Sequence, residues 1–64
     1  MVKYKHYKGA IYEFICKATH SETNEALAIY KNEKNEIFAR PYDMFMEDIV
    51  VNGETVPRFK KMED

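Results

Sequence analysis

A single cysteine, Cys16, restricts how so short a chain can hold itself together. One thiol cannot form an internal disulfide, and a domain of 64 residues buries only about 60% of the surface that its unfolded chain exposes. Aromatic rings offer another source of stability, because large side chains dominate burial in a small core. Nine are present: Tyr4, Tyr7, Tyr12, Phe14, Tyr30, Phe38, Tyr42, Phe45 and Phe59. We therefore expect one domain over residues 1–64 with a core built largely from rings.

The lone thiol also suits a reducing compartment. The sequence has neither an apolar run long enough to span a membrane nor the charged and apolar regions of a signal peptide. We expect a cytoplasmic protein without a membrane partner. Cys16, His6 and His20 are the soft metal ligands, but they lack the paired spacing and the fourth ligand of a closed zinc site. We therefore expect no metal and no cofactor.

Residues 11–19, IYEFICKAT, alternate in the manner of a strand. The pattern predicts Tyr12, Phe14, Cys16 and Ala18 on one face, which is the candidate core face.

Residues 26–40 predict a hairpin in which ALAIYK and EIFAR are joined by residues 32–35. A symmetric four-residue loop would place Lys31 opposite Glu36 and Ile29 opposite Phe38. One face would then carry Leu27, Ile29, Phe38 and Arg40, and the other Ala28, Tyr30, Ile37 and Ala39. Both faces are apolar, so the pattern leaves open which of them is buried.

Pro41 ends this hairpin, because proline lacks the N–H that a strand donates. The following PYDMFMED predicts one helical turn, of α or 3₁₀ type, near residues 41–46. Next, IVVNGETV predicts a hairpin closed by Asn52 and Gly53, with Ile49, Val51 and Val56 on one face. Phe59 is expected to pack, and residues 60–64 to fray.

Short strands, one helical turn and tight hairpins predict an all-β fold. We favour a small SH3-like barrel of about five short strands, because closure removes the exposed edges that a chain this small cannot cover otherwise.

Charge is nearly balanced, with a formal net charge of -1, and phosphate binding normally shows as a basic excess. The distribution is uneven, however. Lysines gather near the start and basic residues return near the end, at Arg58, Lys60 and Lys61, whereas residues 43–54 contain acids and no base. This pattern fits an ordinary solvated surface, with a basic groove formed by the two ends as the alternative.

The segment ATHSETNEA, residues 18–26, concentrates hydroxyls, carboxylates and a histidine. Such side chains bond to nearby backbone, which favours a polar turn between strands. A catalytic reading would use Ser21 or Cys16 with His20 or His6 as base and Glu22 to orient it. Adjacent turn residues rarely point at one another, and no G-x-S-x-G elbow is present, so we favour a non-catalytic role and leave enzymatic activity open.

Five blocks cover nearly the whole chain: YKHYKGAIYEF at 4–14, ATHSETNE at 18–25, IY at 29–30, ARPYDMFMED at 39–48 and NGETVPRF at 52–59. In order and spacing they resemble the small bacterial domain of unknown function 1653. The family pattern reads Y-x-H-Y-K-G, H-S-E-T, R-P-x-x-M-F and P-R-F. It carries over to Tyr4, His6, Tyr7, Lys8, Gly9 and Tyr12, to His20, Ser21, Glu22 and Thr23, and to Arg40, Pro41, Met44, Phe45, Pro57, Arg58 and Phe59. Where the family tends to have tryptophan before the R-P pair, this sequence has Phe38, which stacks less strongly and donates no hydrogen bond.

The resemblance implies no activity, but packing gives no reason to specify this polar set together. Our first hypothesis is a non-catalytic binding module for a small molecule or a protein. Its site would contain His6, His20, Ser21, Glu22, Thr23, Phe38 and Arg40, since an arginine beside a ring suits a carboxylate, a phosphate or a flat ligand. The first alternative is a nucleic-acid surface of Tyr4, Lys5, Tyr7, Lys8, Arg58 and Lys60. The second is a small hydrolase using His20 and Glu22. We expect a monomer or a weak homodimer.

Overall fold

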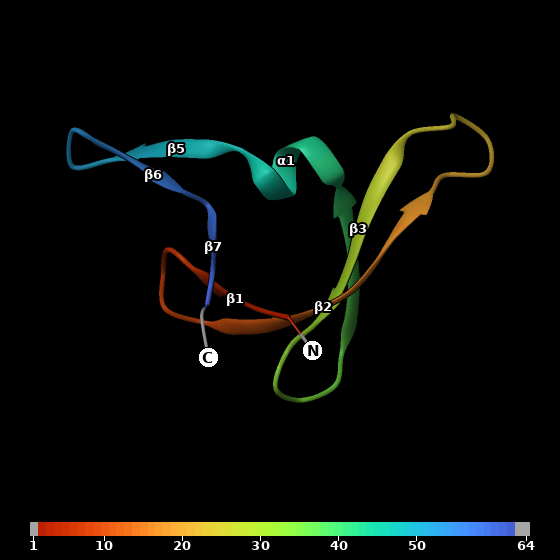
Figure 1. Cartoon of the computed structure of the whole chain (residues 1–64), viewed down its shortest axis with the longest axis horizontal. Helices are drawn as coiled ribbons and strands as arrows, with labels where there is room; N and C mark the ends of the chain where they lie inside the picture. The colour runs from red at the N-terminus through yellow and green to blue at the C-terminus, as the bar shows by residue number, and fades with distance from the viewer. Residues whose placement is uncertain (1, 63–64) are drawn as a thin grey trace.

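The computed structural model describes residues 2–62 and consists mainly of strands, which confirms the all-β prediction. Figure 1 shows the elements in chain order. They are β1 (Lys3–His6), β2 (Ile11–Thr19), β3 (Ala26–Lys31), β4 (Ile37–Pro41), α1 (Tyr42–Met46), β5 (Asp48–Val51), β6 (Glu54–Pro57) and β7 (Phe59–Lys61).

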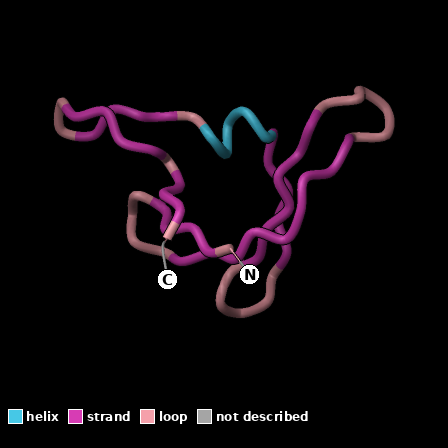
Figure 2. The backbone as a smooth tube through the Cα atoms, in the orientation of Figure 1, coloured by secondary structure: helices cyan, strands magenta, loops and turns pink. Residues whose placement is uncertain are grey.

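Two antiparallel sheets divide these strands. The larger has the order β4-β3-β2-β1-β7, and the smaller pairs β5 with β6. The larger sheet is curved, and the helix joins β4 to the β5–β6 hairpin, which projects away from that sheet (Figure 2). Because β5 and β6 pair only with each other, the strands of residues 2–62 form no closed barrel, and the predicted SH3-like barrel is not confirmed.

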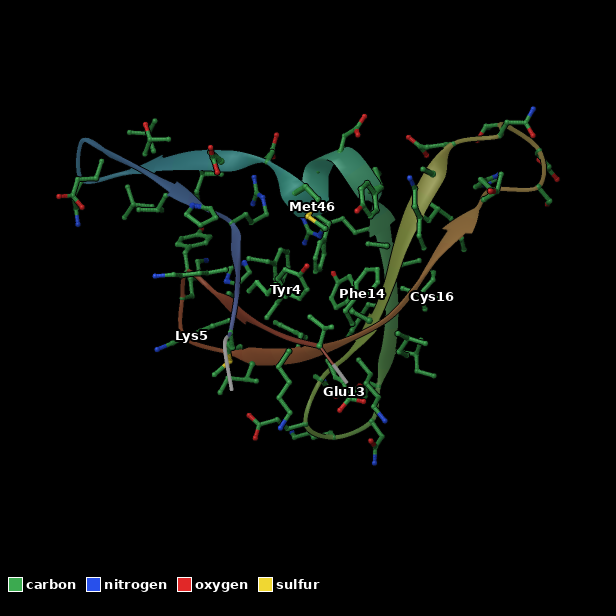
Figure 3. The ribbon with its side chains drawn as sticks, viewed as in Figure 1. Tyr4, Lys5, Glu13, Phe14, Cys16 and Met46 are labelled. Carbon is green, nitrogen blue, oxygen red and sulfur yellow. The ribbon has the colours of Figure 1, made fainter. Side chains whose placement is uncertain are left out.

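The core lies on the concave face of the large sheet and consists mostly of rings. Its buried members are Ala28, Tyr30, Phe45 and Phe59, with Tyr4, Tyr12, Phe14 and Tyr42 packed around them. Figure 3 shows Tyr4 and Phe14 pointing into this interior. Phe45, from the helix, is fully buried and stacks on Phe59 from the last strand, with 4.3 Å between ring centroids.

The helical turn α1 places the ring of Phe45 in the core. Pro41 precedes it with φ at -50° and ψ at 132°, an extended conformation that stops β4 and starts the turn. The predicted turn near residues 41–46 is present as α-helix, and Phe45 is its one buried residue.

A β-bulge interrupts the predicted alternation of β2. Phe14 pairs with Tyr30, but the next pair is Cys16 with Ile29, so Ile15 is an extra residue. A bulge shifts the side-chain phase by one. Cys16 and Ala18 therefore lie on the convex face, not on the core face that the sequence predicted, and Cys16 is exposed.

The hairpin of β3 and β4 forms as predicted, but its register differs by one residue. Lys31 pairs with Ile37, not Glu36, and Tyr30 pairs with Phe38. A slip of one residue exchanges the two faces of one strand relative to the other. Phe38 and Arg40 consequently share the concave face with Ala28 and Tyr30, not with Leu27 and Ile29 as predicted.

The last part of the chain forms the predicted Asn52–Gly53 turn but differs from the prediction for the residues after Phe59. Asn52 and Gly53 both have positive φ, 51° and 82°, as a two-residue hairpin turn requires. Beyond it, Lys60 and Lys61 do not fray: they belong to β7 and pair with Lys5 and Tyr4 of β1. Residues 63–64, included in that prediction, lie outside the described residues.

Candidate functional site

Arg40 lies on the concave side of β4, opposite Ala28. Its Nε donates a hydrogen bond of 3.3 Å to the hydroxyl of Tyr30, and its guanidinium carbon lies 5.6 Å from the centre of the Phe59 ring. Within residues 2–62 the ion pairs join Lys31 to Glu13 and Arg58 to Glu47, so the charge of Arg40 has no carboxylate partner there. A guanidinium has five N–H donors in a rigid fork. One is used, and the terminal nitrogens remain available.

His6 is the last residue of β1 and pairs with Phe59 of β7. Its ring packs edge-on against Phe59, with 4.9 Å between centroids, and lies 4.5 Å from the ring of Tyr7. The backbone N–H of Lys8 donates to His6 Nδ1 at 3.2 Å. Because Nδ1 accepts a hydrogen bond, the neutral ring carries its proton on Nε2, which can donate to a ligand.

The surroundings of His6 favour this neutral form. Burial, and then the positive charges of Arg40, Lys8 and Arg58, lower the pKa of His6 from its ordinary 6.5. An anion placed among these cations would be attracted by all of them. The concave side near His6 is therefore positive and offers an uncharged N–H donor.

Phe38 supplies a flat apolar surface two residues before Arg40 on the same side of β4. Its ring lies 5.7 Å from that of Tyr30 and 6.3 Å from that of Tyr12, and 39% of the residue is exposed. Arg40, His6 and Phe38 thus surround an open face floored by Tyr12, Tyr30 and Phe59. Such a face presents hydrogen-bond donors beside an aromatic surface, and we call it the concave site.

A second arginine lies near this site but is already paired. Arg58 Nη2 donates to Glu47 Oε1 at 2.7 Å, and the Arg58 N–H donates to the Glu47 carbonyl at 3.0 Å. These bonds tie the segment between β6 and β7 to the end of α1. Arg58 Nε is buried and has no hydrogen-bond partner among residues 2–62. Arg58 therefore adds positive potential but serves mainly as a structural link.

The HSET residues form a self-contained turn between β2 and β3. His20 Nδ1 accepts hydrogen bonds from the N–H groups of Glu22 and Thr23, at 3.2 and 3.4 Å, and Thr23 Oγ1 accepts one from Glu25 N–H. Asn24 takes a positive φ of 62° to close the turn. These bonds account for the side chains of His20 and Thr23 as turn formers.

This turn lies apart from the concave site. It begins beyond the Thr19–Ala26 pair, past the end of β4, and projects from the upper right of the molecule in Figure 1. The structure therefore divides the predicted ligand site: His6, Phe38 and Arg40 come together, whereas His20, Ser21, Glu22 and Thr23 lie elsewhere. The alternative nucleophile, Cys16, lies on the convex face and is also separate.

The residues of the predicted nucleic-acid surface are divided as well. Tyr4 points inward, with its ring 5.1 Å from Phe45, and Arg58 is bound to Glu47. Lys5 and Lys60 are cross-strand partners on the outer side of the sheet. Figure 3 shows Lys5 pointing away from the interior. Tyr7 and Lys8 lie in the β1–β2 turn, where the Lys8 ammonium is 5.8 Å from the Tyr7 ring centre.

A family model described as a protein of unknown function, DUF1653, matches residues 2–61. The chain belongs to this family. No curated protein and no solved structure matches it. The family resemblance stated from the sequence is thereby confirmed.

The concave site of this DUF1653 domain includes three residues that the sequence reasoning did not assign to it: Tyr12, Tyr30 and Phe59. All three belong to the aromatic set of the sequence, but their role depends on which rings share a face with Arg40. The correct hairpin register would have put Tyr30 beside Arg40. The placement of Phe59 depends on the pairing of β7 with β1, for which the local pattern contains no signal.

The described part of this DUF1653 domain contains neither a cluster of metal ligands nor a helix that could span a membrane. Among residues 2–62, no three His, Cys, Asp or Glu side chains gather closely enough to hold a metal ion. The one helix of that part of the chain, five residues long, is far too short to cross a membrane.

Proposed function

We propose that this domain is a non-catalytic binding module and that its concave site takes a planar ring bearing a carboxylate or a phosphate. The observation that carries the proposal is the half-buried guanidinium of Arg40, which has no carboxylate partner within residues 2–62, beside the exposed ring of Phe38. A charged group withdrawn from water without a partner costs free energy. An anionic ligand would supply that partner.

Each residue has a distinct part in the proposed complex. The terminal nitrogens of Arg40 bind two oxygens of the anionic group, a geometry in which arginine excels. His6 Nε2–H donates to the same group, and the Tyr30 hydroxyl holds the guanidinium by accepting from Nε. The ligand ring lies against Phe38, since aromatic rings attract one another in offset or edge-to-face contact.

The test is a titration of the ¹⁵N-labelled protein, followed through its amide shifts, with benzoate, phenyl phosphate, inorganic phosphate and benzyl alcohol. We expect benzoate and phenyl phosphate to shift residues 6, 12, 38–40 and 59. Inorganic phosphate should bind more weakly because it lacks the ring, and benzyl alcohol because it lacks the charge. Shifts confined to residues 20–23, or none with any of the four probes, would contradict the proposal.

A matched pair of variants sharpens the test. Arg40→Gln should weaken phenyl phosphate binding about tenfold or more, because hydrogen bonds to a charged group contribute about 1.5–3 kcal/mol. Arg40→Lys keeps the charge but loses the fork, so its loss should be intermediate. Lys31→Gln removes a cation from the convex face, where Lys31 Nζ pairs with Glu13 at 3.6 Å, and should leave binding unchanged. Equal losses in Arg40→Gln and Lys31→Gln would indicate a general charge effect instead of a site.

A further inference from the structure

Two lysines face each other on the outer side of the sheet, and among residues 2–62 neither forms an ion pair with a carboxylate. Lys5 of β1 pairs directly with Lys60 of β7, and both are exposed. Like charges in directly opposite positions destabilise a strand pair. On its other side Lys5 pairs with Ile11, and the nearby Glu13 is bound to Lys31. Within the described part of the chain no ion pair offsets this repulsion.

Two hollows flank this lysine pair. One, of about 400 Å³, lies between the β5–β6 hairpin and β1, and its wall includes Lys5, Tyr7, Val51, Val56, Pro57 and Lys60. The other, of about 490 Å³, is lined by Lys5, Lys60, Lys61 and Met62. Because both hollows are lined by Lys5 and Lys60, they adjoin at this lysine pair and form one path. Among residues 2–62, one carboxylate, that of Glu54, also lines the path.

An exposed aromatic ring stands at one end of this path. Tyr7 is 40% exposed. Its ring is held by His6, with centroids 4.5 Å apart and planes tilted by 35°, and by the Lys8 ammonium at 5.8 Å. These contacts hold the ring in place while a large part of it stays open to a ligand.

We propose that this path, which we call the outer groove, binds a short stretch of single-stranded nucleic acid. Lys5, Lys60 and Lys61 would contact phosphates, and Tyr7 would stack on a base, the combination that proteins use for single strands. The apolar wall of Val51, Val56 and Pro57 would cover the faces of unstacked bases. A duplex keeps its bases stacked inside, so neither Tyr7 nor this wall could be used. Of residues 2–62, Glu54 is the one acid in the groove lining, which also includes lysines and apolar side chains that suit this ligand: Lys5, Lys60, Val51, Val56 and Pro57.

The outer groove is distinct from the concave site. Arg40 and Phe38 are not part of its lining, and His6 lies at the boundary of the two. The groove can therefore bind its ligand whether or not the concave site binds a planar anion. Arg40→Gln separates the two, since it should weaken phenyl phosphate binding at the concave site and leave nucleic-acid binding unchanged.

The experiment is fluorescence anisotropy of a labelled twelve-nucleotide oligothymidylate at several NaCl concentrations. Three phosphate contacts predict a slope of about -2 for the logarithm of affinity against the logarithm of salt, since each contact with a single strand contributes about -0.7. In Lys5→Gln/Lys60→Gln the slope should fall to about -0.7. This variant removes the like-charge pair, so we expect it to fold at least as well as the parent, which a thermal melt checks.

The control is Lys17→Gln/Lys34→Gln, which has the same change in net charge away from the groove. Lys17 lies over the ring of Tyr42, with its ammonium 4.5 Å from the ring centre, and Lys34 is exposed in the β3–β4 loop. This control should keep the parent slope and affinity. If both double variants lose affinity equally, the attraction is one of net charge and the groove assignment is overturned.

Tyr7 tests the stacking contact separately. Tyr7→Ala should weaken oligothymidylate binding about fivefold to 150-fold, as loss of base stacking does elsewhere, whereas Tyr7→Phe should restore it. Three results would overturn the proposal: no binding at low salt, affinity that does not depend on salt, or equal affinity for a duplex of the same length. Tighter binding of a glutamate-rich, leucine-containing peptide than of oligothymidylate would assign the groove to an acidic protein partner instead.

Discussion

The guanidinium of Arg40 lies over the ring of Phe59, with its central carbon 5.6 Å from the ring centre. The two residues come from β4 and β7, which are the opposite edges of the five-stranded sheet. The sheet therefore curls until its edges meet through side chains, without the backbone pairing that would close a barrel. The core and the concave site both depend on this contact.

Phe59 should be among the residues that the fold can least spare. It is 5% exposed and contacts His6, Tyr12, Tyr30 and Phe45 through its ring. We expect Phe59→Ala to lower the free energy of unfolding by about 3–5 kcal/mol, which would leave a domain this small largely unfolded. Urea denaturation followed by circular dichroism measures the loss. Met62→Ala, at an exposed position, is the control, and a comparable loss there would contradict the assignment of the core.

His6 should titrate at a lower pH than an ordinary histidine. Burial and the charges of Arg40, Lys8 and Arg58 lower its pKa from 6.5. Arg40→Gln should raise this pKa towards 6.5 without reaching it, because burial, the largest cause, remains. The ring proton shifts of His6, followed by NMR from pH 4 to 9, give both values. A midpoint at or above 6.5 in the parent would refute the described surroundings of His6.

The same pKa shift has a consequence for stability. As the pH falls below 6.5, His6 takes up a proton more readily in the unfolded chain than in the folded chain. The stabilisation of the fold by neutral His6 is therefore complete above pH 6.5 and is lost as the pH falls through the pKa of His6 in the folded chain. We expect His6→Gln to reduce the loss of stability between pH 7 and pH 5. The check is a series of urea denaturation curves, and an unchanged pH dependence in the variant would contradict this linkage.

Cys16 should react in the folded protein. The bulge at Ile15 turns this thiol outward, and it is exposed. We expect a disulfide reagent to modify it as fast without denaturant as in 6 M urea, within about tenfold, and Cys16→Ser to change stability by about 0.5 kcal/mol or less. Reaction only after unfolding would show that Cys16 points to the core, as simple alternation predicts.

The Asn52–Gly53 turn offers a test of backbone conformation alone. An added Cβ at Gly53 would have no neighbour within 4 Å, but φ is +82°. We expect Gly53→Ala to cost about 1–2 kcal/mol, the strain of an L-residue in a left-handed conformation. Asn52→Gly, which accepts the same conformation freely, should cost less. Equal melting temperatures of parent and Gly53→Ala would contradict the turn geometry.

The sequence predicted local structure well and register poorly, and the β3–β4 hairpin shows why. The sequence predicted its strands and a loop of four residues, 32–35, but the loop in the structure has three residues, 33–35. Asn32 Oδ1 accepts hydrogen bonds from the N–H groups of Lys34 and Glu36, both at 2.9 Å, and Asn35 has a φ of 66°. Asn32 thus pairs with Glu36 around a three-residue loop. Hydrophobic pattern could not reveal this, because both faces of the hairpin are apolar.

The candidate site could be predicted only in part for a related reason. His6, Phe38 and Arg40 were singled out from the sequence, and the structure brings them together. The residues that complete the concave site depend on contacts between distant segments, above all between Phe59 and His6. The HSET residues were predicted to belong to the site because four polar residues follow one another in the sequence. A turn held by side-chain hydrogen bonds and a ligand site both have this property.

The strand order also determines when the molecule can be completed during synthesis. β1 lies between β2 and β7, so the first strand of this domain to be synthesised acquires its second neighbour last. Until Phe59 emerges, the rings of Tyr12, Tyr30 and Phe45 lack the partner that covers them. Until β7 is synthesised, the nascent domain would therefore present an uncovered aromatic surface, and pairings between such distant segments form slowly. The core of this domain is completed only by the arrival of one ring, that of Phe59.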